Sequence, residues 1–163
     1  MKMNWHEQNT KYNALIKDLF HNEDWQKRAE ASRDLGIMRE GRAVNLLCRV
    51  LRSEKDHLVI NRVIEALGRI GDGRATLRII EKLREELNKP KIDKHRIIYI
   101  VEALKRIKDK RALEYIGIFL KSDDKEIKTL TRETFDTIEP NWREIIKQVK
   151  KDKSIQEIFK IKI

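Results

Sequence analysis

The histidine and cysteine side chains are the first to consider, because they are common metal ligands and catalytic groups. The four histidines fall in four separate segments, and no two are four residues apart, the spacing that places two ligands on one helix face. They are His6, His21, His57 and His95. Cys48 is the single cysteine, so the chain forms no internal disulfide and no Cys-based zinc site. We therefore predict no metal site and no cofactor, and we expect Cys48 to be a buried thiol.

A glycine-rich stretch, Gly68-x-x-Gly71-x-Gly73, has some likeness to a phosphate-binding loop. Such loops follow a strand, whereas this stretch follows a helical pattern, so we do not expect it to bind phosphate. A Ser–His–acid triad is defined by geometry rather than by sequence spacing, and no nucleophile-elbow motif indicates one. We predict no catalytic residues and a protein that is not an enzyme.

The elements that hold these residues repeat along the chain. The clearest unit is Ala66–Leu83, and weaker copies surround Leu35–Ala43 and Ala103–Ala112. In each copy a Leu is followed seven residues later by Arg-Ala, and the three Arg residues are 32 and 37 positions apart. Apolar residues recur at helical spacing on both sides of the turn. This period predicts a two-helix unit that must stack on its neighbours to bury its apolar face, as in a helical solenoid.

The turn of each unit has a fixed chemistry. An acidic residue stands two positions before the Arg, and in two copies it is an Asp that can cap the next helix. The expected turn ladder is Glu40 with Arg42, Asp72 with Arg74, and Asp109 with Arg111. We expect Gly36, Gly68 and Gly71 to adopt left-handed backbone angles at the ends of the preceding helices.

The pattern predicts one domain over 1–163. It comprises an N-terminal capping segment over 1–23 with a helix near 9–21, repeats over 24–150, and a C-terminal cap or tail over 151–163. Within the repeats we expect four pairs of helices: 25–35 with 42–52, 57–70 with 74–88, 94–107 with 110–121, and 124–138 with 141–151. Asp24 is an expected N-cap, and either Ser122 or Asp123 is expected to cap the fourth pair. In the tail, Ile155, Ile158 and Phe159 have helical spacing, whereas Phe159, Ile161 and Ile163 alternate like a strand; we prefer a short helix.

Ala66–Leu83, with its Leu-Gly-x-Ile-Gly-Asp-x-Arg-Ala core, resembles a HEAT repeat, especially the phycobilisome-lyase type. The resemblance covers roughly residues 24–150 and implies an all-α, right-handed HEAT-like α-solenoid of about four helical hairpins with terminal capping helices. It also implies that the turn ladder is structural. The chain departs from the family pattern at Lys105, which replaces a glycine, and at Pro140-Asn141-Trp142 in the last unit.

The same resemblance places the second helix of each pair on the inner, concave face. The residues expected to face outward there are mostly basic: Arg49, Arg52, Arg78, Lys82, Arg84, Tyr115 and Lys121. Arginines beside a tyrosine suit the binding of carboxylates or phosphates. Interspersed glutamates, Glu81, Glu85, Glu86 and Glu114, would reduce this positive potential by pairing with neighbouring cations.

The net charge of +10 is compatible with an acidic protein partner or with nucleic acid. No apolar run reaches the roughly 20 residues that span a bilayer, and the N-terminus has no signal-peptide core, so we expect a cytoplasmic protein without membrane partners. Abundant Lys, Glu, Arg and Ile with scarce Gln suggest a thermophile.

We rank three functions. The first is a non-enzymatic scaffold that binds a protein partner, such as an acidic segment, on the concave face. The second is nucleic-acid binding through phosphate contacts. The third is an enzyme, a lyase, hydroxylase or glycosylase, built on a HEAT-like frame.

Overall fold

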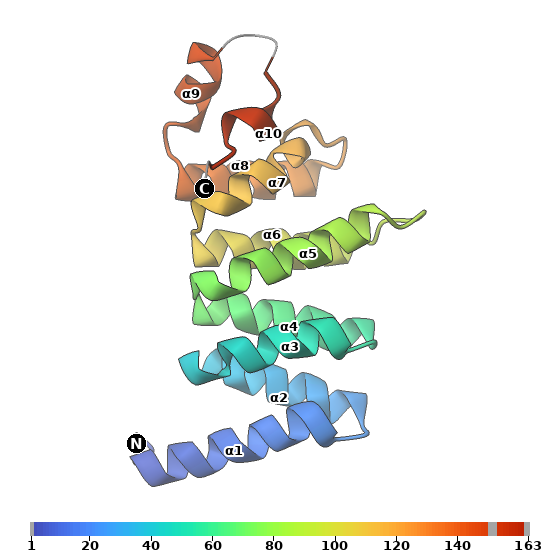
Figure 1. Ribbon diagram of the computed structural model, residues 1–163, viewed down its shortest axis with the longest axis vertical. Helices are drawn as coiled ribbons and strands as arrows, with labels where there is room; N and C mark the ends of the chain where they lie inside the picture. Colours follow the sequence, from blue (N-terminus) through green and yellow to red (C-terminus); the bar gives the residue numbers. More distant parts are fainter. Residues whose placement is uncertain (1, 150–152, 162–163) are drawn as a thin grey trace. The chain divides into compact units, whose positions relative to one another are not determined.

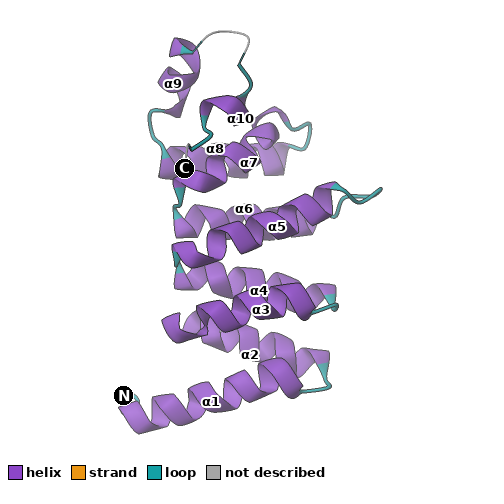
Figure 2. Ribbon diagram, viewed as in Figure 1, coloured by secondary structure: helices purple, strands orange, loops and turns teal. Residues whose placement is uncertain are grey.

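The computed structural model describes residues 2–149 and 153–161, and these residues form helices joined by short turns (Figure 1). No strand occurs in this part of the chain (Figure 2). The α-helices are α1 (Trp5–His21), α2 (Trp25–Ile37), α3 (Val44–Ser53), α4 (His57–Ile70), α5 (Thr76–Leu87), α6 (Lys94–Ile107), α7 (Leu113–Ile116), α8 (Lys125–Ile138), α9 (Trp142–Gln148) and α10 (Ile155–Ile158). Four 3-10 helices accompany them: η1 (Gly41–Ala43), η2 (Gly73–Ala75), η3 (Lys110–Ala112) and η4 (Gly117–Lys121). The prediction of an all-α fold is confirmed.

The chain divides into two compact units, Met1–Ala75 and Thr76–Ile163. In the first unit α2 packs along α4, with α1 against α2 and α3 against α4. Its core consists of aliphatic side chains spaced three and four residues apart, and those of Leu35, Leu47, Val63, Ile64 and Leu67 are 0% exposed. This is the side-by-side helix packing expected for an α-solenoid.

In the second unit α6 packs along α8, α5 lies against α6, and η4 lies against α8. Ile79, Ile100, Leu104, Ile116 and Phe135 are 0% exposed in its core. In both units the first helices of successive pairs therefore lie side by side, and a second helix packs onto that layer. The prediction of a single domain over 1–163 stays a prediction.

The predicted helix boundaries are confirmed for α4 and α6, and the other elements differ in informative ways. The first helix begins at Trp5 and not near residue 9, because Asn4 and Glu7 form a capping box in which each side chain accepts the other's backbone N–H. Asp24 caps α2 as predicted. The fourth pair is capped by Asp124, so Ser122 and Asp123 were wrong. Ser122 instead accepts the backbone N–H of Asp124.

Left-handed backbone angles were predicted at Gly36 and Gly68, but they occur three residues after each of these glycines. Gly36 and Gly68 lie inside helices, and positive φ values occur at Arg39 (50°), Gly71 (76°) and Lys108 (61°). Gly36 serves packing instead, since a Cβ there would lie 2.7 Å from the Cα of Ala66 on α4. The feature that the three turns share is thus a residue with left-handed backbone angles four positions after the Leu.

The last pair of helices departs from the predicted pattern. In place of the expected second helix over 141–151, the structure has the shorter α9, which ends at Gln148. Residues 150–151 lie outside the described part. The short C-terminal α10 is the element that packs against α7 and η4. Gly117 makes room for it, because a Cβ there would lie 2.4 Å from Cγ2 of Ile155. Phe159, just after α10, meets the buried Phe135 edge to face at 5.2 Å. The preferred short helix is confirmed over Ile155–Ile158. Residues 151–152 and 162–163, which include Ile163, lie outside the described residues.

Two glutamates with largely buried side chains, which the sequence reasoning missed as structural residues, close the connections between repeats. Glu54 accepts the backbone N–H groups of Lys55 and Asp56 and forms a two-point ion pair with Arg28, with N–O distances of 2.8 and 3.2 Å. Glu86 accepts the N–H of Asp93 at 2.7 Å, across the loop that follows α5. Because the two glutamates are 32 positions apart, like Arg42 and Arg74, their repetition was a signal available in the sequence.

Candidate interaction surface

The turn pairs, namely Glu40–Arg42, Asp72–Arg74 and Asp109–Arg111, each close within one turn. The closest N–O distances are 2.9, 2.8 and 2.6 Å in that order. In the first unit the arginines also reach the preceding element. Arg42 donates to Oδ1 of Asn9 at 2.9 Å and lies 4.1 Å above the ring of Tyr12, and Arg74 donates to the carbonyl of Gly41 at 3.3 Å. These contacts suit the structural role expected for the ladder.

The carboxyl groups of the turn pairs have lowered pKa values. Side-chain hydrogen bonds from their arginines hold the pKa of Glu40 and of Asp72 below the ordinary values of 4.5 and 3.8. Burial raises the pKa of Asp109, but hydrogen bonds from its arginine outweigh this effect, so that this pKa is also lowered. All three groups are therefore anions at neutral pH.

In the first unit, the two predicted binding residues lie on α3. Arg49 is exposed, and its guanidinium carbon lies 5.5 Å from the ring centroid of Phe20 on α1. Arg52 is exposed near the end of the same helix. The aromatic contact holds Arg49 close to the protein surface without removing its charge.

In the second unit, α5 carries three of the predicted residues, and two of them have carboxylate partners. Arg78 lies 2.7 Å from Glu81, and Lys82 lies 2.9 Å from Glu85. Both pairs form over three residues, as expected for glutamates that pair with neighbouring cations. The side chain of Lys82 is only 11% exposed. Arg78 and Lys82 therefore contribute little net charge at this surface.

The remaining predicted residues come together differently. The guanidinium carbon of Arg84 on α5 lies 4.9 Å from the ring centroid of Tyr115 on α7, and this contact joins the two helices. Tyr115, Ile118 and Lys121 follow at three-residue spacing into the 3-10 helix η4, where residues three apart share a face. Leu77 lies seven positions before Arg84 and hence on the same face of α5. We call these five residues the α5–η4 surface. Its apolar members Leu77 and Ile118 are 47% and 52% exposed, and sequence reasoning missed both.

A second repeated feature was also missed. Arg52, Arg84 and Lys121 are separated by the same 32 and 37 positions as the turn arginines, so that each of the three repeats ends its second helix with a cation. All three residues are exposed. A cation at the C-terminus of a helix stabilises it through the helix dipole, and it also places a positive charge on the surface at a regular interval.

In residues 2–149 and 153–161, no group of three or more His, Cys, Asp or Glu side chains is arranged to hold a metal ion. Cys48 is 8% exposed, so the predicted buried thiol is confirmed. In the same part of the chain, no helix has the length and apolar character needed to cross a bilayer.

Comparison with known proteins identifies the repeats. A family model of HEAT repeats matches residues 12–92, from α1 to the loop after α5. The match concerns HEAT repeats in general and does not single out the phycobilisome-lyase type. No curated protein matches the chain. Together with the stacked helix pairs and their repeated turn, this match leads to one conclusion: the chain belongs to the HEAT repeat family.

Proposed function

We propose that the protein is an interaction scaffold, whose α5–η4 surface binds an acidic protein segment that also carries an apolar side chain. HEAT repeats commonly serve as protein-interaction scaffolds and the family is generally not enzymatic. The observation that carries the proposal is the stacking of Arg84 on Tyr115, on elements that also expose Leu77 and Ile118. Arg and Tyr are the residue types that most often dominate binding energy at protein interfaces.

The charges at this surface favour a protein over nucleic acid. Phosphate recognition requires several free cations along a strand, because affinity comes from the release of many counterions. Arg78 and Lys82 on the same helix are paired with Glu81 and Glu85. Arg84 and Lys121 remain beside apolar side chains, an arrangement that fits a short acidic segment with one buried anchor.

The test measures peptide binding by fluorescence anisotropy with the full chain. The probe is a labelled twelve-residue peptide with four Glu residues around one Phe, in a Gly-Ser background. A labelled 20-base-pair DNA duplex and a single-stranded RNA serve as competing probes across a salt series. We expect the acidic peptide to bind, and we expect the double charge reversal Arg84→Glu with Lys121→Glu to weaken binding about tenfold or more, which corresponds to roughly 1.4 kcal/mol.

The matched control reverses two cations on another helix of the same unit. Lys128→Glu with Arg132→Glu on α8 changes the net charge equally and should leave peptide affinity within about twofold. If both double variants weaken binding equally, only the net charge matters and the proposed surface is wrong. Tighter binding of DNA or RNA with a steep loss of affinity on adding salt would instead support the nucleic-acid function.

A further inference from the structure

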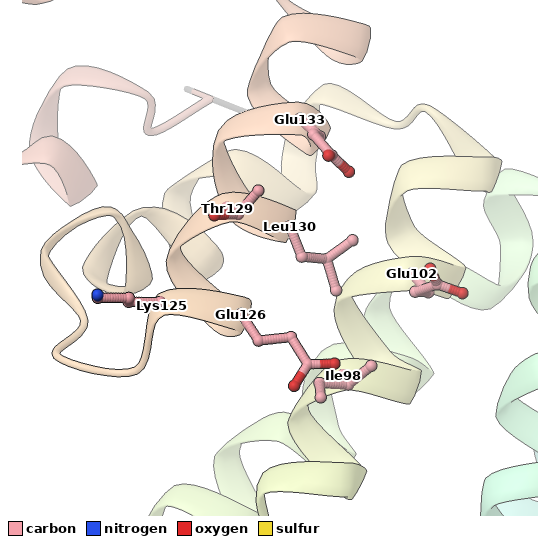
Figure 3. A pocket seen from close by; sticks show the side chains of 7 residues that line it. All are labelled: Ile98, Glu102, Lys125, Glu126, Thr129, Leu130 and Glu133. Carbon is pink, nitrogen blue, oxygen red and sulfur yellow. The ribbon is translucent and has the colours of Figure 1, made fainter.

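A groove between α6 and α8 lies apart from the α5–η4 surface. It has a volume of about 420 Å³ and is lined by residues of these two helices: Ile98, Glu102, Lys125, Glu126, Thr129, Leu130 and Glu133. Figure 3 shows the side chain of Leu130 pointing from α8 toward α6, with Glu102 on the facing helix. Lys125 points away from this space. The groove thus has an apolar floor and a rim of carboxylates.

Two sets of ion pairs link the two helices at the two ends of this groove. Near the start of both helices, Lys94 lies 2.9 Å from Asp124 and 2.8 Å from Glu126. Further along, Lys105 lies 3.3 Å from Glu133. Because both sets cross from α6 to α8, the groove is formed before any ligand arrives, which reduces the entropic cost of binding.

The floor is suited to an alkyl side chain. Leu130 is 8% exposed and Ile98 is partly exposed, and both are aliphatic. Glu102 lies one helical turn after Ile98 on the same face of α6, between the two sets of ion pairs. A Lys or Arg side chain placed here would bury its alkyl stem on the floor and bring its charge to Glu102.

The charge reverses at the far end of the groove. A second hollow of about 230 Å³ shares Glu102 and is lined further by Lys105, Arg106, Lys108 and Thr137. Lys105 is paired with Glu133, but the exposed Arg106 and Lys108 would repel a uniformly basic ligand that extended along the groove. The ligand should therefore carry a basic residue at one end and an acidic residue at the other.

We propose that the α6–α8 groove is a docking site for a protein segment of opposite end charges, in which a Lys or Arg beside an apolar residue binds at Ile98, Glu102 and Leu130. The acidic end of the segment then faces Arg106 and Lys108. Charge complementarity along the groove identifies this partner chemistry. The site is separate from the proposed acidic-segment surface, and it requires a different ligand.

The experiment is a two-dimensional 15N–1H NMR titration of the full chain. The probe is a twelve-residue Gly-Ser peptide with Arg-Leu and, three residues further, Glu; a second peptide has Glu in place of Arg. We expect the first peptide to shift the amide signals of α6 and α8 around Glu102 and Leu130. Glu102→Lys should weaken its binding about tenfold, and Ile98→Ala about threefold. The second peptide should bind at least tenfold more weakly.

The control is Glu114→Lys on α7, which makes the same charge change away from the groove and should bind the first peptide like the wild type. The proposal is overturned if the signals that shift lie outside α6 and α8, if both peptides bind alike, or if Glu102→Lys has no effect. Signals in the groove that move with protein concentration alone would show that a second copy of the chain occupies it, and would also overturn the proposal. None of these outcomes involves Arg84 or Lys121, so they leave the proposed scaffold function untouched.

Discussion

At the scale of single residues, the side chains that recur most regularly along the chain are those of the turn pairs, and they stabilise the turns. Each acid of the turn pairs accepts hydrogen bonds from an arginine two positions away, and Asp72 and Asp109 also accept a backbone N–H at the start of the next 3-10 helix. These bonds explain why charged residues recur so strictly without forming a reactive centre. The binding candidates Arg84 and Lys121 recur just as strictly, but they lie at the exposed ends of helices.

The lowered pKa values of these acids predict how stability depends on pH. Folding lowers the pKa of Glu40, Asp72 and Asp109 below 4.5 or 3.8, so the stabilisation that they give is fully present above those values. It is lost as the pH falls through the still lower folded pKa values. We expect the free energy of unfolding, measured by urea denaturation, to decrease below about pH 4.5.

The triple variant Glu40→Gln, Asp72→Asn and Asp109→Asn is the comparison for this measurement. It should be less stable than the wild type at pH 7, and its stability should fall less steeply between pH 4.5 and 2. Parallel pH profiles for the two proteins would show that other carboxylates control acid unfolding.

At the scale of the elements, the close packing of α2 and α4 depends on Gly36. A Cβ there would lie 2.7 Å from the Cα of Ala66 and 3.0 Å from its Cβ, so the two helices would have to separate. We expect Gly36→Ala to lower the free energy of unfolding by about 1–3 kcal/mol, even though alanine favours helices, because overpacking outweighs helix propensity.

The matched control is Gly41→Ala, which has nothing within 4 Å of the added Cβ and should change stability by less than about 0.5 kcal/mol. Chemical denaturation followed by circular dichroism measures both variants. A stable Gly36→Ala protein would mean that the α2–α4 contact tolerates a wider helix spacing than the one observed.

The attachment of α10 depends on a second glycine. Gly117→Ala places a methyl group against Ile155, and the side chain or the whole of α10 must then move. We expect faster amide hydrogen exchange over 153–161 with little change in α5 and α6. Adding Ile155→Ala to this variant should leave the methyl group more room and restore part of the protection; the absence of any effect on 153–161 would show that α10 is held mainly through Phe159.

At the scale of the whole molecule, the excess positive charge is concentrated in one unit, whereas a buried core is present in both. Lys and Arg outnumber Asp and Glu by 14 to 11 in Met1–Ala75 and by 23 to 16 in Thr76–Ile163, so most of the excess positive charge belongs to the second unit. Each unit nevertheless has its own buried aliphatic core. In a repeat protein, where each repeat contacts mainly its neighbours, such units can open separately.

Core truncations in the two units test this separation. Leu35→Ala in the first unit and Ile100→Ala in the second each remove a side chain that is 0% exposed and should cost about 2–5 kcal/mol locally. We expect hydrogen exchange to rise first in the unit that carries the substitution. An equal rise in both units would indicate one cooperative domain, as the sequence-based prediction of a single domain requires.

The sequence by itself determined the repeat, its helical class, the positions of the turns and the family. These features depend on local spacing, such as the seven residues from Leu67 to Arg74, and on apolar periodicity, which act over one or two turns of helix. Asp24 and the buried Cys48 were predictable for the same reason. The capping box at Asn4 and Glu7 depends on an equally local spacing and was predictable too.

Tertiary structure decided which helices meet and which charges remain free. Gly36 has the sequence context of a helix end, yet it lies inside α2 because α4 approaches it, and that approach involves residues 30 positions away. In the sequence, Arg78, Lys82 and Arg84 are equivalent basic residues of one predicted helix. In the structure, Arg78 pairs with Glu81 and Lys82 with Glu85, whereas Arg84 lies on the ring of Tyr115. The α6–α8 groove, and the packing of α10 against η4, likewise depend on contacts between distant segments, which spacing along a single helix does not encode.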